Sequence, residues 1–134
     1  MTRYQTTNWR LNVLASPLLA LLAAPLLAAA PTPETTSSNF FEQQIRPVLA
    51  SKCLKCHGPA KQKSNLRLDS RAAILQGGKK GPAIVPGKPN QSRLIAALKH
   101  QGPEMPPNGQ LPSKTIRAFE AWVAAGAPWP EETA

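Results

Sequence analysis

The chain has 134 residues, of which 16 are basic and 7 acidic, and its formal net charge is +9 at neutral pH. This length corresponds to about one domain. A basic chain can bind nucleic acid, but residues 42–118, which hold 14 of the 16 basic residues, contain no aromatic residue (Phe, Trp or Tyr), so the composition argues against a nucleic-acid partner.

The first 30 residues have the layout of a secretory signal peptide. Arg3 and Arg10 give a positive start, residues 11–30 are rich in Leu and Ala without a charge, and three alanines end the stretch. This order is typical of a segment that directs export and is then removed. The stretch is also long enough to span a bilayer, so an uncleaved anchor at residues 11–30 is the alternative. In both cases we expect a periplasmic or otherwise exported domain, attached to a membrane only if the segment is retained.

The following segment predicts a linker and then a helix. Residues 31–38 are polar and rich in Pro, Ser and Thr, as linkers are. Asn39 is placed to cap a helix, with Glu42 as its capping-box partner. Pro47 lies inside this helix, where a proline kinks or splits it. The apolar face of the predicted helix contains Phe41, Ile45, Val48 and Leu49.

The sequence Cys53-Leu54-Lys55-Cys56-His57 is a C-x-x-C-H motif, the pattern for covalent attachment of a c-type haem. Residues three apart lie about one turn apart on the same side of a helix, which suits two thioether bonds to one haem. His57 is then carried under the iron, where it can be the proximal ligand. The chain has no other cysteine, so we expect one covalent haem c.

Three other interpretations of the two cysteines compete with haem attachment. Cys53, Cys56, His57 and His100 could bind zinc, but a structural zinc site prefers a second tight ligand pair and His100 stands alone. A dithiol redox motif would need a strand-helix unit that is not visible upstream. A structural disulfide between residues this close would close a very short loop and stabilise the fold little.

The middle of the chain predicts two short helices within long loops. The first begins at Asp69 or Ser70 and stops at Gly77-Gly78. The second begins at Asn90, and its apolar residues are Leu94, Ile95 and Leu98.

Met105 is the candidate for the second axial ligand of the iron. The only other methionine is Met1, in the export segment, and Met105 lies 48 residues beyond His57 in a segment stiffened by prolines. A methionine often only fills an apolar gap, but the polar and Pro-rich surroundings of Met105 do not suit that role. His100 and an open coordination site are the alternatives.

The last predicted helix begins at Ser113 and ends at Gly126, and its apolar residues are Ile116, Phe119, Trp122 and Val123. The predicted fold class is therefore all-α, with three to five short helices and long loops. Loops without structure of their own are unusual in a compact domain, and we expect them to wrap round one covalent haem.

This ordered set of features resembles the planctomycete-type cytochrome c domain. The resemblance rests on Ile45-Arg46-Pro47-Val48-Leu49, the C-x-x-C-H motif, Leu66-Arg67-Leu68-Asp69-Ser70, Gly77-Gly78, the run from Gly81 to Pro89, Met105-Pro106-Pro107 and the end Gly126-Ala127-Pro128-Trp129. It implies a small, class I-like cytochrome c fold at residues 39–130, followed by a tail at 131–134, and a haem ligated by His57 and Met105. Gly81-Pro82 resembles the Gly-Pro of class I cytochromes, which makes the Pro82 carbonyl a candidate acceptor for His57.

Two classes of function follow from these predictions. A six-coordinate haem predicts an exported electron carrier that exchanges one electron with a redox partner protein. A displaceable sixth ligand would instead suit a haem-based ligand sensor or a peroxidase-like domain. The positive charge fits a partner with an acidic docking face, and Lys52, Lys55, Lys61, Lys63, Lys79 and Lys80 are candidates to surround the haem edge.

Overall fold

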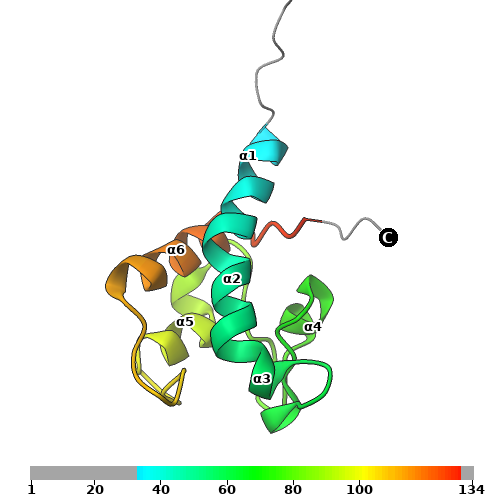
Figure 1. Ribbon diagram of the computed structural model, residues 1–134, viewed down its shortest axis with the longest axis vertical. Helices are drawn as coiled ribbons and strands as arrows, with labels where there is room; N and C mark the ends of the chain where they lie inside the picture. Colours follow the sequence, from blue (N-terminus) through cyan, green and yellow to red (C-terminus); the bar gives the residue numbers. More distant parts are fainter. Residues whose placement is uncertain (1–32, 131–134) are drawn as a thin grey trace, which may run out of the picture.

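The structure, a computed structural model, describes residues 33–130 (Figure 1). Within this range the chain is helical, and its extended pairings are two isolated bridges, His57 with Gln62 and Gly78 with Gly81. The predicted all-α class is therefore confirmed. The signal peptide or anchor and the tail at 131–134 lie outside the described residues. In the described part no helix combines the length and the apolar character needed to cross a membrane.

Five helical segments follow one another without a break and form the long helix that runs vertically in Figure 1. They are α1 (Pro33–Phe40), η1 (Phe41–Ile45), α2 (Arg46–Val48), η2 (Leu49–Cys53) and α3 (Leu54–His57). The start differs from the sequence expectation, because Asn39 lies inside α1 and residues 33–38 are helical. Proline at a first helical position loses no hydrogen bond and has a suitable φ, so Pro33 can begin the helix before Asn39.

Pro47 neither ends this helix nor splits it, because η1 and η2 are π-helical turns on either side of it. In η1 the Arg46 N–H donates to the Phe41 carbonyl, five residues back. A proline in a helix removes a donor and its ring crowds the carbonyl four residues earlier. The wider π turn before Pro47 changes this pairing locally, and the helix continues to the C-x-x-C-H motif.

Four further segments are short: η3 (Lys63–Asn65), α4 (Arg71–Gln76), η4 (Pro89–Gln91) and α5 (Arg93–Leu98). Ser70 caps α4 as predicted, since its Oγ accepts a hydrogen bond from the Ala73 N–H at 3.2 Å. Gly77 ends α4 with φ +73, and a Cβ there would lie 1.9 Å from the Gly81 oxygen. Asn90 does not cap α5. It lies in η4, and Ser92 takes the N-cap position without a side-chain cap bond.

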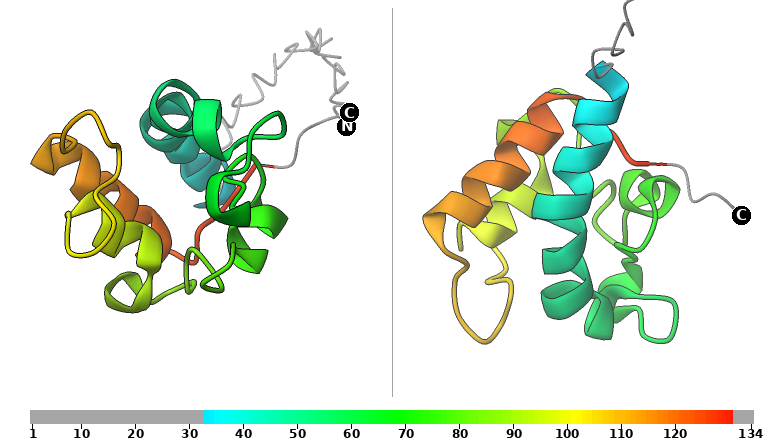
Figure 2. Two further views of the ribbon diagram at one scale, coloured as in Figure 1. Left: turned by 90° about the horizontal axis from the view of Figure 1, so that it is seen from below. Right: turned by 45° about the horizontal axis from the view of Figure 1, so that its top comes forward.

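The core lies between the long helix, α5 and α6 (Ser113–Ala124), which pack side by side in both views of Figure 2. Trp122 of α6 is at its centre, with its ring centroid 5.8 Å from that of Phe41 and its Nε1 donating to the Pro128 carbonyl at 2.8 Å. The largest buried side chains include the predicted residues Phe41, Ile45, Leu49, Ile95, Leu98, Phe119, Trp122 and Val123. The predicted apolar faces are thus the ones that build the core.

Candidate functional site

Cys53 and Cys56 lie where η2 passes into α3, at the lower end of the long helix in Figure 1. Both are half-buried free thiols. Cys53 packs against the hydrophobic core, and burial raises the pKa of its thiol from 9.0 to about 11. Cys53 therefore stays a neutral thiol at physiological pH.

His57, the last residue of α3, is buried with only 8% of its surface exposed. Its Nδ1 lies 3.3 Å from the Leu66 carbonyl oxygen. A carbonyl only accepts hydrogen bonds, so Nδ1 is the donor in this contact, and in the neutral imidazole the lone pair is then on Nε2. This is the arrangement of a metal-ligating histidine, whose other ring nitrogen is oriented by a carbonyl. The acceptor is Leu66 where the sequence had suggested Pro82.

Close backbone contacts hold the Leu66 carbonyl in place. The Leu68 N–H donates to the His57 carbonyl at 2.8 Å, and the Lys79 N–H donates to the Ser64 carbonyl at 3.0 Å. Gly78 fits tightly against this loop, because a Cβ added there would lie 2.6 Å from the Ser64 oxygen and 3.0 Å from the Leu66 Cβ. The orientation of His57 thus depends on a glycine 21 residues further along the chain.

Met105 lies in the loop between α5 and α6 and is half-buried. Its N–H donates to the Ala97 carbonyl near the end of α5 at 3.2 Å, and the peptide bond to Pro106 is cis. It is the one methionine among residues 33–130. The backbone of the candidate ligand is therefore anchored to a buried helix.

His100 is close to Met105. Its N–H also donates to the Ala97 carbonyl, at 3.1 Å, so the two amide nitrogens are at most 6.3 Å apart. Its Nε2 is buried and has no hydrogen-bond partner within the described part of the chain. An unpaired buried polar atom is costly, which makes His100 a residue to test together with Met105.

The donor set fits a c-type haem better than the alternatives. Among residues 33–130 no group of three or more His, Cys, Asp or Glu side chains could hold a metal ion. The proposed zinc set of Cys53, Cys56, His57 and His100 is therefore not assembled, and the two cysteines form no disulfide. Cys53 and Cys56 offer two free thiols, and His57 offers an oriented imidazole on the same stretch of helix. Met105 offers a thioether from another part of the fold. These are the ligand types of a His/Met haem c.

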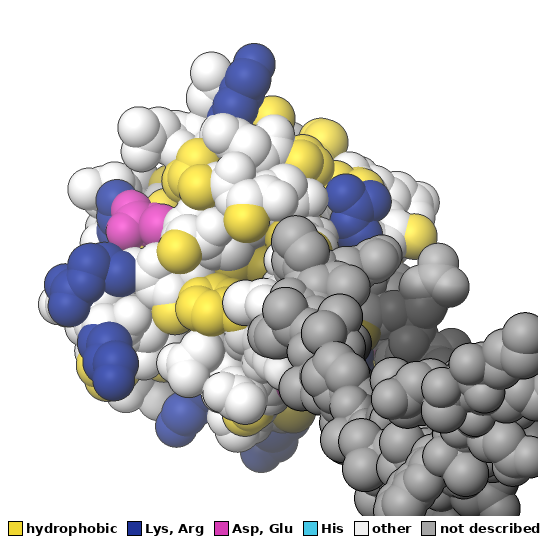
Figure 3. Space-filling model, turned by 90° about the horizontal axis from the view of Figure 1, so that it is seen from above, with side chains coloured by type: hydrophobic (Ala, Val, Ile, Leu, Met, Phe, Trp, Pro, Cys, Tyr) yellow, Lys and Arg dark blue, Asp and Glu magenta, His cyan; other side chains and the backbone are white. Residues whose placement is uncertain are grey.

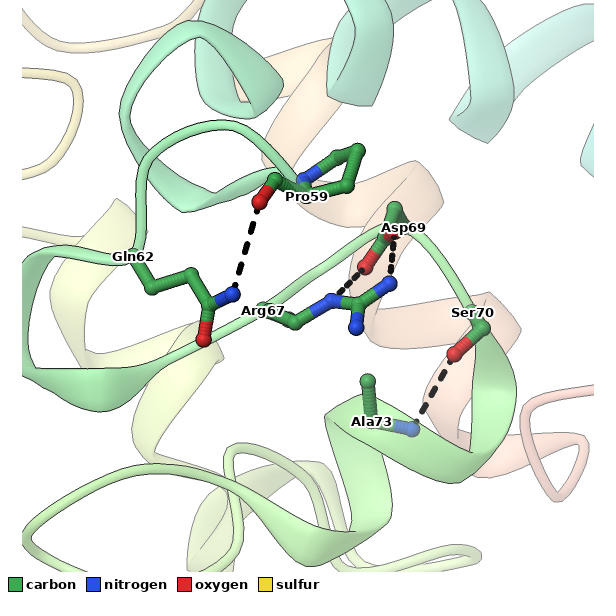
Figure 4. A network of polar contacts seen from close by, with 6 residues as sticks. All are labelled: Pro59, Gln62, Arg67, Asp69, Ser70 and Ala73. Atoms are coloured by element: carbon green, nitrogen blue, oxygen red, sulfur yellow. Dashed lines mark hydrogen bonds and ion pairs between the residues drawn. The ribbon is translucent and has the colours of Figure 1, made fainter.

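A polar network lies beside this site (Figure 4). Arg67 donates from Nε and Nη2 to the two carboxylate oxygens of Asp69, at 3.0 and 2.6 Å. These hydrogen bonds hold the pKa of Asp69 below its usual value. Gln62 and Arg67 help to line a surface cavity of about 460 Å³. None of the candidate haem ligands lines this cavity.

The predicted haem-edge lysines are exposed: Lys52, Lys55, Lys61, Lys63, Lys79 and Lys80. Figure 3 shows the opposite end of the molecule, where Lys and Arg side chains are spread over the face and acidic colour is visible at one spot only. Residues 33–130 contain 14 basic and 5 acidic residues. The charge of the domain is thus positive on more than one side.

Comparison with known families finds that residues 53–109 match the family described as planctomycete cytochrome C. The match begins at Cys53 and includes Cys56, His57, Pro82 and Met105. No curated protein and no solved structure matches the chain. The resemblance that the sequence suggested is therefore confirmed.

The sequence did not predict the Leu66 carbonyl as the acceptor for His57 Nδ1. Every residue has a backbone carbonyl, so the residue type at position 66 does not indicate this role.

Proposed function

We propose that the protein is an exported electron carrier with one covalent haem, on the premise that residues 53–109 match the family described as planctomycete cytochrome C. The family supports haem binding and electron transfer as the general role. The number of haems, the ligands, the export and the partner are the specific parts of our proposal.

The haem would be held by four side chains. Cys53 and Cys56 would supply the two thioether bonds, His57 Nε2 the proximal ligand and Met105 Sδ the distal ligand. The single observation that carries this assignment is the 3.3 Å contact between His57 Nδ1 and the Leu66 carbonyl, which leaves Nε2 free to bind a metal. When bound, the haem supplies an iron that gains and loses one electron.

Electron transfer is favoured over catalysis by the side chains near Met105. A peroxidase-like reaction needs a vacant iron site and a positioned acid or base. Glu104 is exposed, and His100 is the only imidazole that the backbone brings near Met105. A ligand sensor or peroxidase-like domain with a displaceable Met105 remains the alternative proposal.

The test is an absorption spectrum of the protein, reduced and oxidised, with and without carbon monoxide. We expect a haem that survives denaturing electrophoresis and a reduced spectrum unchanged by carbon monoxide. Replacing both cysteines, Cys53→Ser with Cys56→Ser, should leave no haem on the denatured chain. Haem that extracts freely from the unaltered protein would contradict the proposal, and binding of carbon monoxide would favour the sensor or peroxidase alternative.

Export has a separate test. We propose that residues 1–30 direct the chain to the periplasmic side, where a redox partner with an acidic face would meet it. Deletion of residues 1–30 should give a colourless cytoplasmic product. The mass of the exported chain distinguishes a cleaved signal peptide from an anchor retained at residues 11–30.

A further inference from the structure

A groove separates the first helical stretch from α6. It has a volume of about 420 Å³ and is lined by Phe40, Gln43 and Gln44 on one side and by Lys114, Arg117 and Ala121 on the other. Its lining residues belong to α1, η1 and α6, and α1 stands in Figure 1 at the end of the long helix away from α3. None of its residues belongs to the candidate haem site.

The groove combines an apolar contact with unpaired positive charge. Phe40 is 36% exposed, and among the residues that the structure describes it is the only large hydrophobic residue that is exposed. Lys114 and Arg117 are exposed, one turn apart on α6, and neither forms an ion pair within residues 33–130. The groove therefore offers an incoming segment an apolar contact at Phe40 and two positive charges on the facing side.

Glu42 and Glu120, which lie on the two segments that line the groove, pair with other cations. Glu42 pairs with Arg46 at 2.7 Å, on the same helical stretch as Phe40. Glu120 of α6 pairs with Lys99 of the neighbouring segment. The positive charge of Lys114 and Arg117 therefore remains available to an incoming group.

We propose that this groove docks an extended acidic segment of a partner protein. Its carboxylates would pair with Lys114 and Arg117, and an apolar side chain would pack on Phe40 and Ala121. The amides of Gln43 and Gln44 can donate to the backbone carbonyls of such a segment. Because the groove lies away from Cys53, Cys56 and His57, the docked segment would hold the domain while leaving that end uncovered.

The test uses the protein as expressed and a fluorescein-labelled, end-blocked peptide that repeats Glu-Glu-Leu. We expect salt-dependent binding, with backbone amide shifts at Gln43, Gln44 and Ala121 in nitrogen-edited NMR spectra. Lys114→Ala with Arg117→Ala should weaken the Kd about tenfold or more, and Phe40→Ser should also weaken it. The control Lys88→Ala with Arg93→Ala removes one exposed lysine and one exposed arginine outside the groove. It should change the Kd less than about twofold, because exposed charges contribute little.

A charge reversal separates loss of binding from loss of folding. The variant Lys114→Glu with Arg117→Glu should bind a peptide that repeats Lys-Lys-Leu, which the unaltered protein should not bind. An equal loss in the Lys88 and Arg93 control would show non-specific attraction and overturn the proposal. So would groove-dependent binding to phosphatidylglycerol vesicles without peptide binding, since that result would indicate a membrane surface as the occupant.

Discussion

His57 Nδ1 and the Leu66 carbonyl oxygen lie 3.3 Å apart, which ties the C-x-x-C-H motif to a loop that the motif does not contain. The loop in turn is fixed by the close approach of Gly78 to Ser64 and Leu66. The orientation of the candidate iron ligand is therefore a property of residues 57–78 together.

Gly78→Ala should disturb this arrangement. The added methyl group would lie 2.6 Å from the Ser64 oxygen, so the loop must shift, at a cost of about 1–3 kcal/mol. A weaker bond at Nδ1 makes His57 a poorer donor to ferric iron, so the midpoint potential of the loaded protein should rise. Thermal unfolding and a redox titration measure the two effects.

Gly102→Ala is the matched control, because nothing lies within 4 Å of its added Cβ and its φ is not positive. It should leave the midpoint potential unchanged. Equal potentials in the two variants would show that the Leu66 contact does not tune His57.

Burial of Cys53 predicts how the haem-free chain reacts. Its pKa is raised from 9.0 to about 11, so alkylation of the folded Cys56→Ser variant by iodoacetamide should reach half its maximal rate near pH 11, against about pH 9 in urea. The unfolded state loses the proton first, so the free energy of unfolding falls as the pH rises from 9 to 11. Mass spectrometry follows the alkylation. A native midpoint near pH 9 would mean that Cys53 is exposed before haem attachment.

Ser92→Ala should destabilise the fold without changing the haem site. Ser92 is 2% exposed, and its Oγ accepts from the Val85 N–H at 2.9 Å and donates to the Lys88 carbonyl at 3.0 Å. Loss of both bonds leaves the Val85 N–H without its partner, at a cost of about 1–3 kcal/mol, while the Lys88 carbonyl keeps its hydrogen bond from the Gln91 N–H at 3.1 Å. The Tm should fall by about 4–8 °C for each kcal/mol.

Ser113→Ala removes an exposed serine at the start of α6 and serves as the control. Its effect should stay within about 0.5 kcal/mol. A similar loss of stability in both variants would rule out the buried hydrogen bonds of Ser92 as the cause.

Apolar spacing predicted the elements that build the core. The helix with Ile116, Phe119 and Trp122 is present, and the serine that caps α4 is Ser70, because helix periodicity and capping chemistry are local. Pro47 and Asn39 were interpreted incorrectly by the same local rules. The helix begins at Pro33, so Asn39 lies inside it. The π turns on either side of Pro47 allow the helix to continue through that residue.

The candidate ligand types could be proposed from the sequence, since C-x-x-C-H is a contiguous motif and Met105 has no competing methionine outside residues 1–30. The Leu66 carbonyl, the shared Ala97 acceptor and the groove could not. They depend on backbone atoms and on helices that meet in space, and neither is encoded in the spacing of residue types along the chain.

The final prediction concerns Met105 and its neighbour His100, whose amides share the Ala97 carbonyl. Thioether ligation raises the potential of a haem, so Met105→Ala should lower the midpoint potential by on the order of 100 mV, within the roughly 0.8 V that axial ligands span. The variant should also bind carbon monoxide, while Met105→His should stay six-coordinate at low potential. His100→Ala is the control and should keep the unaltered spectrum. If instead Met105→Ala has the unaltered spectrum and His100→Ala binds carbon monoxide, His100 is the distal ligand, and the ligand-binding alternative gains over the electron carrier.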